Sequence, residues 1–588
     1  MSTQLPAGRY LSCLTDIHPA QGGQTRAALM RTRLLRAEAG IDSTLMTFTA
    51  APDYERRREV LLDSGLLLPG TGFLNVYDYY RDHAWAEPLE DSAPLQDLRD
   101  HQTGQQDRPD GTPWRNSFLS PDTGLTSFDY LRPDGTTYLR IPRYSLKDTK
   151  TWPTAIQQVS PDGVVVGLFP SLGDWFRGWL RHLCRDDERS FIFVDSRHLV
   201  PRLLPMKDPD KYLIYVLHNV HVRTPRRWDS PIAPLYGQVL SRISAMDGFV
   251  TLTTRQHEDV AERCGATNNM FVVPNPVDLT PMPKTKVQRD PLLATVVARL
   301  EPQKRLDHAV AAFAQVLESI PDARLEIHGA GSRRAELVTE IARRGHSRSV
   351  TLLGFDPHAR QALWRSSAFL MTSQFEGYPL ATLESFSHGC PVVSYDIKYG
   401  PREQITDGVD GFLVPDGDIS GLADRVVRLL ESPTLVRDMG AAARKKAATH
   451  GADRFLQDWT SVLSAVVDQK SRRCVIEDVQ LEVTSLESGR LPDFAGVLRM
   501  QLLSGSASLD TVRVELSAVY PRTGRVVDLP VDVRRQQEEL QINTRPVVED
   551  LPVTLGPEEP SYLRLRVVLQ NAVWQTRVPW SSAPGTPS

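Results

Sequence analysis

The sequence predicts an α/β protein with two parallel-sheet domains in tandem and two added β-rich parts. Its 588 residues exceed what a single hydrophobic core usually holds. In two long stretches, apolar strand-like runs alternate with amphipathic helical segments, which is typical of a parallel sheet covered on both faces. Two other stretches show the turn signals and period-two alternation of antiparallel strands. We expect a first α/β domain over residues 1–71 and 190–278, a β-rich insertion over 72–189, a second α/β domain over 279–467 and a β-rich domain over 474–588.

The composition is that of an ordinary globular protein. Hydrophobic residues make up 41% of the chain, charged residues 24%, and the net charge is −4, so nothing indicates a nucleic-acid partner. No apolar run reaches the roughly 20 residues of a membrane span, and residues 1–8 lack the pattern of a secretion signal. The five cysteines are scattered without metal-ligand spacing, as in reduced intracellular proteins. These features predict a cytoplasmic protein.

The chain opens with a strand, a loop and a helix. Residues 9–17 form a buried-strand run, and residues 26–40 carry apolar residues at helical spacing and end at a glycine. The loop between them contains Gly22 and Gly23, at the first strand-to-helix turn, where α/β folds commonly bind ligands. This order predicts a β-loop-α-β start, and the same alternation of strands and helices resumes at residue 190.

The predicted insertion is rich in Gly, Pro and Asp turn signals. Its clearest pattern covers residues 128–142, where Pro133-Asp134-Gly135 separates two alternating runs and predicts a hairpin. Residues 96–113 are polar and are interpreted as a mobile loop.

The second α/β domain follows a polar stretch, residues 279–291, that is interpreted as a linker. Strands and helices then alternate up to about residue 414, and helices fill residues 419–467. After residue 474 the runs alternate at period two, which predicts a small antiparallel sandwich.

Two glutamates eight residues apart mark the strongest candidate site. Glu376 precedes a Gly-Tyr-Pro turn, and Pro379 suits the first turn of a helix whose N-terminal amides suit phosphate. Glu384 lies one to two turns into that helix, between apolar neighbours. Carboxylates can accept two hydrogen bonds from a vicinal diol, so Glu376 could hold a sugar and Glu384 a ribose. The alternative is a helix-terminal charge at Glu376 and a solvated Glu384, and this motif alone leaves both open.

Two cations in "ARLEPQKRLD" favour ligand binding. Arg299 and Lys304 flank a loop that runs from a strand end into a helix. Two cations there could clamp a diphosphate and stabilise its charge as it leaves. The alternative is a pair of solvated loop cations. A Gly329-Ala330-Gly331 turn at another strand end adds a weaker indication.

The order of these motifs resembles the retaining nucleotide-sugar glycosyltransferases of family four, which have the GT-B fold. The resemblance spans residues 9–467 without the insertion and rests on the Glu-x7-Glu and Arg-x4-Lys patterns together. It implies two Rossmann-like domains facing a cleft, with the last helices able to cross back to the first domain. It also implies a metal-independent hexosyltransferase that moves a hexose or N-acetylhexosamine from a UDP-sugar to a hydroxyl, with retention.

The family's donor site can be carried onto the matching residues. The resemblance implies that Gly23 lies against the diphosphate, that Arg299 and Lys304 bind it, that Glu376 contacts the donor sugar and that Glu384 contacts the ribose. Further donor-binding candidates implied by the same motifs are Gly329, Gly331, Gly354, Phe355, Gly377, Tyr378, Pro379 and Leu380.

A finer resemblance is to the branch that glycosylates wall teichoic acid polyols or serine-rich surface adhesins. It rests on the β-rich insertion and on the segments "YVLHNVHV" and "YDIKYGPREQI". It implies that His218 is catalytic and lies beside the transferred sugar, with His221 as second choice and Tyr399 as a further sugar or acceptor contact. It also implies that the insertion serves acceptor binding and homo-oligomerisation. We expect a cytoplasmic enzyme that can work at the inner face of the membrane. The acceptor stays open between a polyol-phosphate polymer and Ser/Thr of a protein; a non-catalytic partner of a sister transferase is the remaining alternative.

We expect neither a metal nor a cofactor. Metal-using transferases employ Asp-X-Asp, which occurs here as Asp208-Pro209-Asp210 and Asp416-Gly417-Asp418. Such a two-letter pattern recurs by chance about twice in this length, and both copies lie in turn-like stretches. Arg299 and Lys304 would supply the positive charge instead. A dinucleotide-binding oxidoreductase would need Gly-x-Gly-x-x-Gly after the first strand, and residues 18–25 lack it.

Overall fold

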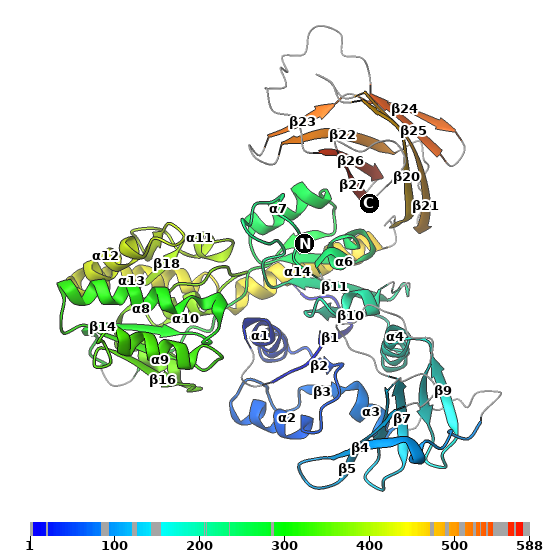
Figure 1. The fold of residues 1–588 in the computed structure, drawn as a ribbon, viewed down its shortest axis with the longest axis horizontal. Coiled ribbons are helices and arrows are strands. Elements are labelled where there is room, and N and C mark those ends of the chain that lie inside the picture. Colours follow the sequence, from blue (N-terminus) through cyan, green and yellow to red (C-terminus); the bar gives the residue numbers. More distant parts are fainter. Residues whose placement is uncertain are drawn as a thin grey trace. The chain divides into compact units, whose positions relative to one another are not determined.

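A computed structural model describes most of the chain, and its elements are shown in Figure 1. The described residues are 4–18, 22–83, 93–119, 126–142, 155–204, 206, 208–234, 236–283, 287–470, 475–487, 493–504, 512–520, 525–529, 531–536, 539–544, 562–569 and 572–579. They divide into two compact units. The first unit covers residues 1–220, 251–253 and 273–460, and the second covers 221–250, 254–272 and 461–588.

The N-terminal half of the first unit is built on parallel strands, because its apolar runs are separated by helices that cover the sheet. The strands are β1 (Arg9–Leu14), β2 (Ser43–Thr47), β3 (Gly72–Asn75), β10 (Ser190–Val194) and β11 (Lys211–Leu217), in the order β11-β10-β1-β2-β3. The helices are α1 (Gly23–Ala37), α2 (Tyr54–Asp63), α3 (Val76–Asp82), α4 (Leu172–Leu183) and α5 (Val200–Leu203). All neighbouring strands are parallel, so the residues that follow β1, β10 and β11 gather at one edge, the carboxyl edge of this sheet.

The insertion is smaller than the sequence predicts. Gly72–Asn75 pairs in parallel with β2, and α3 and α4 pack beside the parallel sheet, so only residues between them form the added sheet. That sheet is antiparallel and contains β4 (Gln102–Asp107), β5 (Pro113–Leu119), β6 (Thr126–Leu131), β7 (Thr137–Pro142), β8 (Ile156–Val159) and β9 (Val165–Phe169), with the short helix η1 (Arg99–His101) before β4. The predicted hairpin is confirmed as β6–β7. The predicted mobile loop at residues 96–113 is wrong, since β4 pairs with β5.

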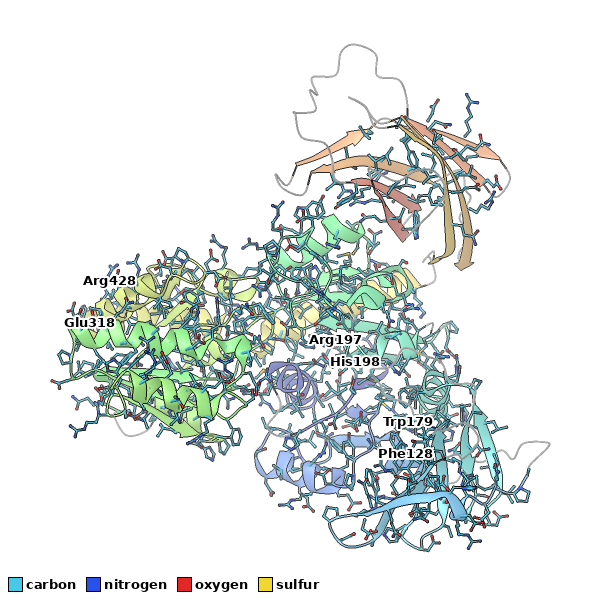
Figure 2. The ribbon with its side chains drawn as sticks, viewed as in Figure 1. Phe128, Trp179, Arg197, His198, Glu318 and Arg428 are labelled. Atoms are coloured by element: carbon cyan, nitrogen blue, oxygen red, sulfur yellow. The ribbon has the colours of Figure 1, made fainter. Side chains whose placement is uncertain are left out.

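Aromatic and charged contacts attach this sheet to the parallel domain. Tyr77 of α3 packs on Tyr130 of β6 and on Trp175 of α4, with ring centroids 4.9 and 5.0 Å apart. Phe128 of the same β6 and Trp179 of α4 are marked in Figure 2.

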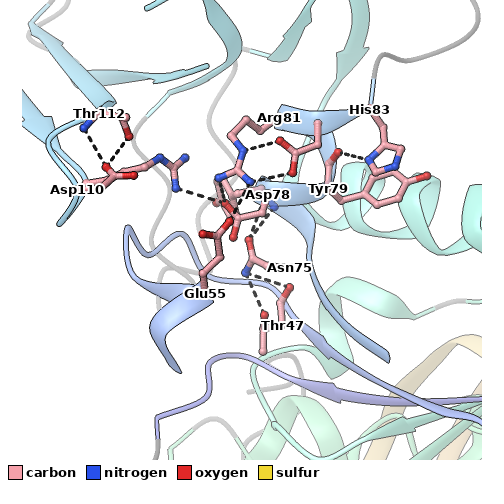
Figure 3. A network of polar contacts seen from close by, with 12 residues as sticks. Thr47, Glu55, Asn75, Asp78, Tyr79, Arg81, His83, Asp110 and Thr112 are labelled. Atoms are coloured by element: carbon pink, nitrogen blue, oxygen red, sulfur yellow. Dashed lines mark hydrogen bonds and ion pairs between the residues drawn. The ribbon is translucent and has the colours of Figure 1, made fainter. Parts of the chain in front are cut away.

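A polar network joins the same elements, as Figure 3 shows. Asp78 of α3 lies 3.0 Å from Arg81 and 3.6 Å from Arg108 of the β4–β5 turn. The Asn75 side chain caps α3 and donates to Thr47 of β2. The insertion is therefore anchored to the N-terminal half by buried packing as well as by the chain.

The C-terminal half of the first unit contains a second parallel sheet. Its strands are β14 (Asp290–Val297), β15 (Arg324–His328), β16 (Val350–Gly354), β17 (Ser366–Met371), β18 (Val392–Tyr395) and β19 (Gly411–Val414), in the order β16-β15-β14-β17-β18-β19. Its helices are η3 (Pro302–Lys304), α8 (Leu306–Ser319), α9 (Arg334–Arg343), η4 (Ala359–Trp364), α10 (Leu380–Ser387), α11 (Gly400–Gln404), α12 (Ile419–Leu430) and α13 (Pro433–Ala448). A core of buried residues such as Val296, Phe313 and Leu370 lies between sheet and helices.

Helix α14 (Ala452–Lys470) follows this half and packs on the first sheet. The Trp459 ring meets Phe193 of β10 edge-on, with centroids 5.0 Å apart. The guanidinium of Arg31 on α1 lies above both rings, 4.5 Å from Phe193 and 5.8 Å from Trp459. The end of the C-terminal half thus helps to cover the N-terminal sheet.

The second unit contains the C-terminal sandwich. It also holds α6 (Tyr236–Leu240), η2 (Ile243–Ala245), β12 (Gly248–Thr251), α7 (Thr254–Cys264) and β13 (Met270–Val272). Its antiparallel strands are β20 (Val475–Glu487), β21 (Asp493–Ser504), β22 (Arg513–Tyr520), β23 (Arg525–Leu529), β24 (Val531–Gln536), β25 (Glu539–Thr544), β26 (Tyr562–Leu569) and β27 (Ala572–Pro579). They form two sheets, β20-β21-β25-β24 and β23-β22-β26-β27, around a shared core that includes Leu498 and Leu565, so the predicted sandwich is confirmed. Arg564 of β26 pairs with Glu262 of α7 at 2.7 Å.

Candidate functional site

Two loops at the carboxyl edge of the second sheet bring Lys304 and Glu376 together. The Lys304 Nζ donates to Glu376 Oε1 at 2.5 Å, and the two side chains are only 20% and 12% exposed. The loops are held by further bonds: Thr372 Oγ1 donates to the Lys304 carbonyl at 2.8 Å, and Gln303 Nε2 donates to the Phe375 carbonyl at 2.8 Å. Lys304 is therefore not a solvated loop cation. The two sequence motifs that carry Lys304 and Glu376 therefore meet at one place in the structure.

The backbone of Glu376 is fixed on both sides. Its amide donates to the Lys398 carbonyl at 3.0 Å, and its carbonyl accepts from the Tyr399 amide at 2.7 Å. The Tyr399 side chain is completely buried. The contact of Tyr399 with sugar or acceptor stays a prediction; the structure shows a buried ring and a backbone bond from its amide to Glu376.

Glu384 lies in the second turn of α10 and is 8% exposed, so a solvated glutamate is excluded. Its Oε1 lies 2.7 Å from Arg26 Nη2, and its Oε2 lies 2.7 Å from Arg360 Nε. Arg26 belongs to the first turns of α1 in the N-terminal half, and Arg360 to η4 in the C-terminal half. The carboxylate is therefore held where the two halves of the first unit meet. Neither arginine carries a motif that sequence reasoning could have used.

Arg299 and the Gly-Gly loop are also close together. A Cβ atom at Gly22 would lie 3.3 Å from Arg299 Nε, whereas a Cβ at Gly23 would meet no described atom within 4 Å. Gly22 is the residue before α1, and Gly23 begins the helix, so the position of Gly23 against a diphosphate stays a prediction. The Arg299 side chain is exposed, and no ion pair of the described residues includes it.

The Gly-x-Gly turn packs against the segment that carries Arg299. Cβ atoms at Gly329 and Gly331 would fall under 3.0 Å from the carbonyl oxygens of Ala298 and Leu300. The Leu300 amide donates to the Ala330 carbonyl at 2.9 Å. Both positions need glycine for the turn to pack this closely against the segment of Arg299. The two glycines therefore have a structural role, and they lie beside the site.

The remaining donor candidates differ in exposure. The Gly354 carbonyl accepts from the Gly329 amide at 2.7 Å, and the neighbouring Phe355 is 62% exposed. Tyr378 and Leu380 are buried. Pro379 is the N-cap of α10, next to the predicted first turn, and its carbonyl accepts from Gln404 Nε2 at 3.1 Å.

His218 follows β11 at the carboxyl edge of the first sheet and meets the Glu376 loop. A Cβ atom at Gly377 would fall under 3.0 Å from the His218 carbonyl oxygen, so only glycine fits there without a shift. The His218 Nε2 lies 2.7 Å from Asp195 Oδ1. Asp195 follows β10 at the same edge, before Arg197 and His198, which are labelled in Figure 2.

The Asp195 carboxylate is buried and contacts two side chains, Arg31 and His218. Arg31 Nη2 lies 2.6 Å from Oδ2 and Nη1 lies 3.1 Å from Oδ1. Burial raises the pKa of Asp195, but Arg31 and His218 together outweigh it and hold the pKa below its ordinary value. Sequence reasoning missed Asp195, although its place at the end of a predicted strand was a usable indication.

His221, the second-choice histidine, stays a prediction. It belongs to the second unit, and its side chain is completely buried.

The two Asp-X-Asp segments have structural partners. Asp208 pairs with Arg181 at 3.1 Å, and Asp210 bonds Lys211 at the amino end of β11, the edge opposite His218. Asp416 pairs with Arg305, and the Asp418 side chain caps α12. Among the residues the structure describes, no group of three or more His, Cys, Asp or Glu side chains is arranged to hold a metal ion. Within the same residues, no helix combines the length and apolarity of a membrane span.

The two parallel-sheet halves have the GT-B glycosyltransferase fold. A Staphylococcus aureus TarM variant, solved with fondaparinux, alpha-GlcNAc-glycerol and UDP, matches 78% of this chain and 100% of its own, with a TM-score of 0.60 at 19% identity. The pneumococcal O-GlcNAc transferase GtfA, solved with UDP and GlcNAc, matches 78% of this chain and 99% of its own, with a TM-score of 0.57 at 16% identity. At these identities the likeness establishes the fold, and the fold predicted from sequence is confirmed.

Residues 280–446 match the family described as "Glycosyl transferases group 1". A poly(glycerol-phosphate) alpha-glucosyltransferase of Bacillus subtilis is 28% identical over 298 residues, 50% of this chain and 44% of the relative. An exopolysaccharide phosphotransferase of Streptomyces coelicolor is 34% identical over 234 residues, 40% of this chain and 25% of the relative. The chain thus spans less than half the length of these two curated relatives. Fold and family match together support the predicted glycosyltransferase class.

Proposed function

We propose that the protein is a hexosyltransferase that moves a hexose or N-acetylhexosamine from a UDP-sugar to a hydroxyl acceptor, with retention at the anomeric carbon. The observation that carries the proposal is the Lys304–Glu376 pair, 2.5 Å apart, beside the contact between Gly377 and His218. A cation and a carboxylate this close together can contact the two groups on either side of the bond that breaks. The cation can contact the diphosphate and the carboxylate the sugar. A UDP donor is supported by UDP in the structures of TarM and GtfA.

Each donor group has a candidate partner. Arg299 and Lys304 bind the diphosphate, and the N-terminus of α1 at Gly23 faces it. Glu376 contacts the sugar, and Glu384 accepts from the ribose hydroxyls. Because a carboxylate has about four acceptor positions, Glu384 can bind a ribose while it keeps part of its contact with Arg26 and Arg360.

The reaction needs no protein nucleophile. The bond from the anomeric carbon to the phosphate oxygen breaks, and the acceptor oxygen attacks the same face of the sugar. The departing phosphate takes the acceptor proton, so the products are the glycoside and UDP. Arg299 and Lys304 stabilise the charge that grows on the diphosphate, and Glu376 stabilises the positive charge of the sugar. We propose that no metal takes part, because these two cations occupy that role.

The favoured acceptor is a polyol-phosphate polymer of the teichoic acid type. The relative named as a poly(glycerol-phosphate) glucosyltransferase supports this choice. The fold shared with GtfA supports the alternative, Ser/Thr of a protein. A non-catalytic partner of a sister transferase is less well supported, because Arg299, Lys304 and Glu376 are all present. The insertion sheet would bind the extended acceptor or a second copy, since the edge strand β4 is exposed along its whole length.

A donor screen tests the proposal directly. The full chain is incubated with UDP- and GDP-sugars, and hydrolysis and thermal shift are measured for each. We expect one UDP-hexose or UDP-N-acetylhexosamine to be hydrolysed and to stabilise the protein. Lys304→Ala should lose both effects, whereas Lys445→Ala, at an exposed position of α13, should keep them. Hydrolysis of GDP-sugars only would refute the donor assignment.

A further inference from the structure

We propose that Asp195 and Arg31 are positioning residues for His218. Asp195 fixes the imidazole so that Nε2 carries the hydrogen and Nδ1 is the accepting nitrogen, and Arg31 keeps Asp195 in place. The inference rests on the proposed function, because His218 is the residue placed beside the transferred sugar.

The geometry supports a chain of three side chains in which each member is buried. His218 is 7% exposed in its side chain, Arg31 is 3% exposed and Asp195 is fully buried. Both Asp195 oxygens contact Arg31, at 3.1 and 2.6 Å, and Oδ1 also lies 2.7 Å from His218 Nε2. A carboxylate with this many fixed partners has little freedom to rotate, so it can define the plane of the imidazole.

The charge of Asp195 decides the tautomer. An ionised carboxylate only accepts hydrogen bonds, so the nitrogen that faces it must donate. The low pKa of Asp195 keeps it ionised. In the neutral ring, Nδ1 is then an acceptor and can receive a hydrogen bond from a hydroxyl of the donor sugar or of the acceptor.

Arg31 supplies the balancing charge and is itself fixed. Its Nη2 donates to Ser12 Oγ at 3.0 Å, and its guanidinium lies on the Phe193 ring. One positive and one negative charge leave the pair neutral. Asp195 can therefore orient His218 without placing a net negative charge beside it.

Helix α1 links this chain to the donor site. The helix begins at Gly23. Its Arg26 Nη2 lies 2.7 Å from Glu384 Oε1, and its Arg31, five residues further along, pairs with Asp195. The helix that faces the diphosphate in the proposed function thus also positions His218. Changes at Asp195 should therefore affect the chemical step more than donor binding.

The first test is spectroscopic and does not depend on turnover. The full chain is labelled with 15N-histidine, and the His218 signals are assigned by their loss in His218→Gln. In the neutral form of the ring, we expect the wild type to show protonated Nε2 and unprotonated Nδ1. A ring protonated at Nδ1 alone would overturn the proposal. The result stands whether or not a UDP-sugar is the donor, so it separates this inference from the proposed function.

The second test is kinetic. Asp195→Asn keeps the size of the side chain but allows the amide to donate to Nε2, so both tautomers become populated. We expect kcat to fall about 10- to 100-fold, with KM for the donor changed less than about threefold. The matched control is Asp129→Asn, which breaks another buried Asp–Arg pair, Asp129 with Arg140, away from the site. It should leave donor hydrolysis unchanged.

Arg31→Lys keeps the positive charge beside Asp195, so we expect this variant to fold. We expect it to retain the His218 tautomer and more activity than Arg31→Met. UDP thermal shift reports whether each variant is folded. Wild-type kcat in folded Asp195→Asn, or equal losses in kcat and donor affinity, would refute a positioning role.

Discussion

The carbonyl oxygen of His218 faces the α-carbon of Gly377 so closely that a Cβ atom there would fall under 3.0 Å from it. His218 belongs to the N-terminal half of the first unit and Gly377 to the C-terminal half, next to Glu376. The absence of a side chain at position 377 therefore determines how near the candidate histidine and the candidate sugar-binding carboxylate can come.

Gly377→Ala should separate these two loops. A displacement of about 1 Å at a catalytic centre can cost about 100-fold in rate, so we expect turnover to fall by that order. Overpacking should also lower the free energy of unfolding by about 1–3 kcal/mol, measured by denaturant titration. Gly451→Ala is the control, because a Cβ there would make an ordinary contact at 3.5 Å. Full activity in Gly377→Ala would show that this approach is not needed.

Glu384→Gln should remove ribose recognition. A hydrogen bond to a charged group contributes about 1.5–3 kcal/mol, so the wild type should bind UDP at least about 10-fold more tightly than 2′-deoxy-UDP. Calorimetry should show that this preference is lost in Glu384→Gln, while kcat changes little. The variant also leaves Arg26 and Arg360 without their carboxylate, so the comparison of two ligands on one protein is the informative one.

The contrast is Glu376→Gln, in which kcat should fall more than donor affinity, since its partner is the sugar that becomes positive in the transition state. An unchanged preference for UDP in Glu384→Gln, or a loss confined to affinity in Glu376→Gln, would reverse the two assignments.

Turnover should persist in excess EDTA, because in the proposed function Arg299 and Lys304 supply the positive charge at the diphosphate. Initial rates with and without EDTA are compared on the same preparation after dialysis. Activity that disappears and returns with manganese would contradict this. Asp208 and Asp210 would then need testing, although both lie at the edge opposite His218.

Removal of the insertion should affect the acceptor rather than the donor. The deletion covers residues 84–170 and is closed with a Gly-Ser linker, so that β3, α3 and α4 remain. The two ends of the deletion lead into helices that are in contact, since the Tyr79 hydroxyl of α3 lies 3.0 Å from His182 Nε2 of α4. UDP binding by calorimetry should be kept, transfer to a polyol-phosphate polymer should fall at least about 10-fold, and the particle should be smaller on size exclusion if the insertion joins subunits. Unchanged polymer transfer would rule out an acceptor platform.

Much of the fold could be predicted because each strand and helix shows its own pattern in consecutive residues. Strand and helix patterns defined both parallel sheets, and strand ends indicated Arg299, His218 and the Glu376 loop. The edge strand β4 was missed, because all its side chains are exposed and polar and so show no alternation. Gly72–Asn75 was assigned to the insertion, because four residues cannot reveal which strand they pair with.

The partners of the candidate residues were less predictable. Arg26, Arg31 and Arg360 look like ordinary helical or loop arginines in sequence. They contact Glu384 and Asp195 only because the fold brings together residues 24 to 358 positions apart in the chain. Asp195 follows a predicted strand, yet its role depends on His218, 23 residues later. Long-range pairs of this kind leave no local pattern.

In the proposed function, Lys304 and Glu376 form the site where a nucleotide sugar reacts. The most direct measurement is the turnover of Lys304→Ala with the donor found in the screen, beside wild type and Lys445→Ala. Lys304 is 20% exposed and paired, so circular dichroism first checks that the variant is folded. We expect Lys304→Ala to lose about 100-fold or more in turnover, the usual effect of removing one charge-stabilising group, and Lys445→Ala to be unaffected. A folded Lys304→Ala that keeps more than half of wild-type turnover would contradict it.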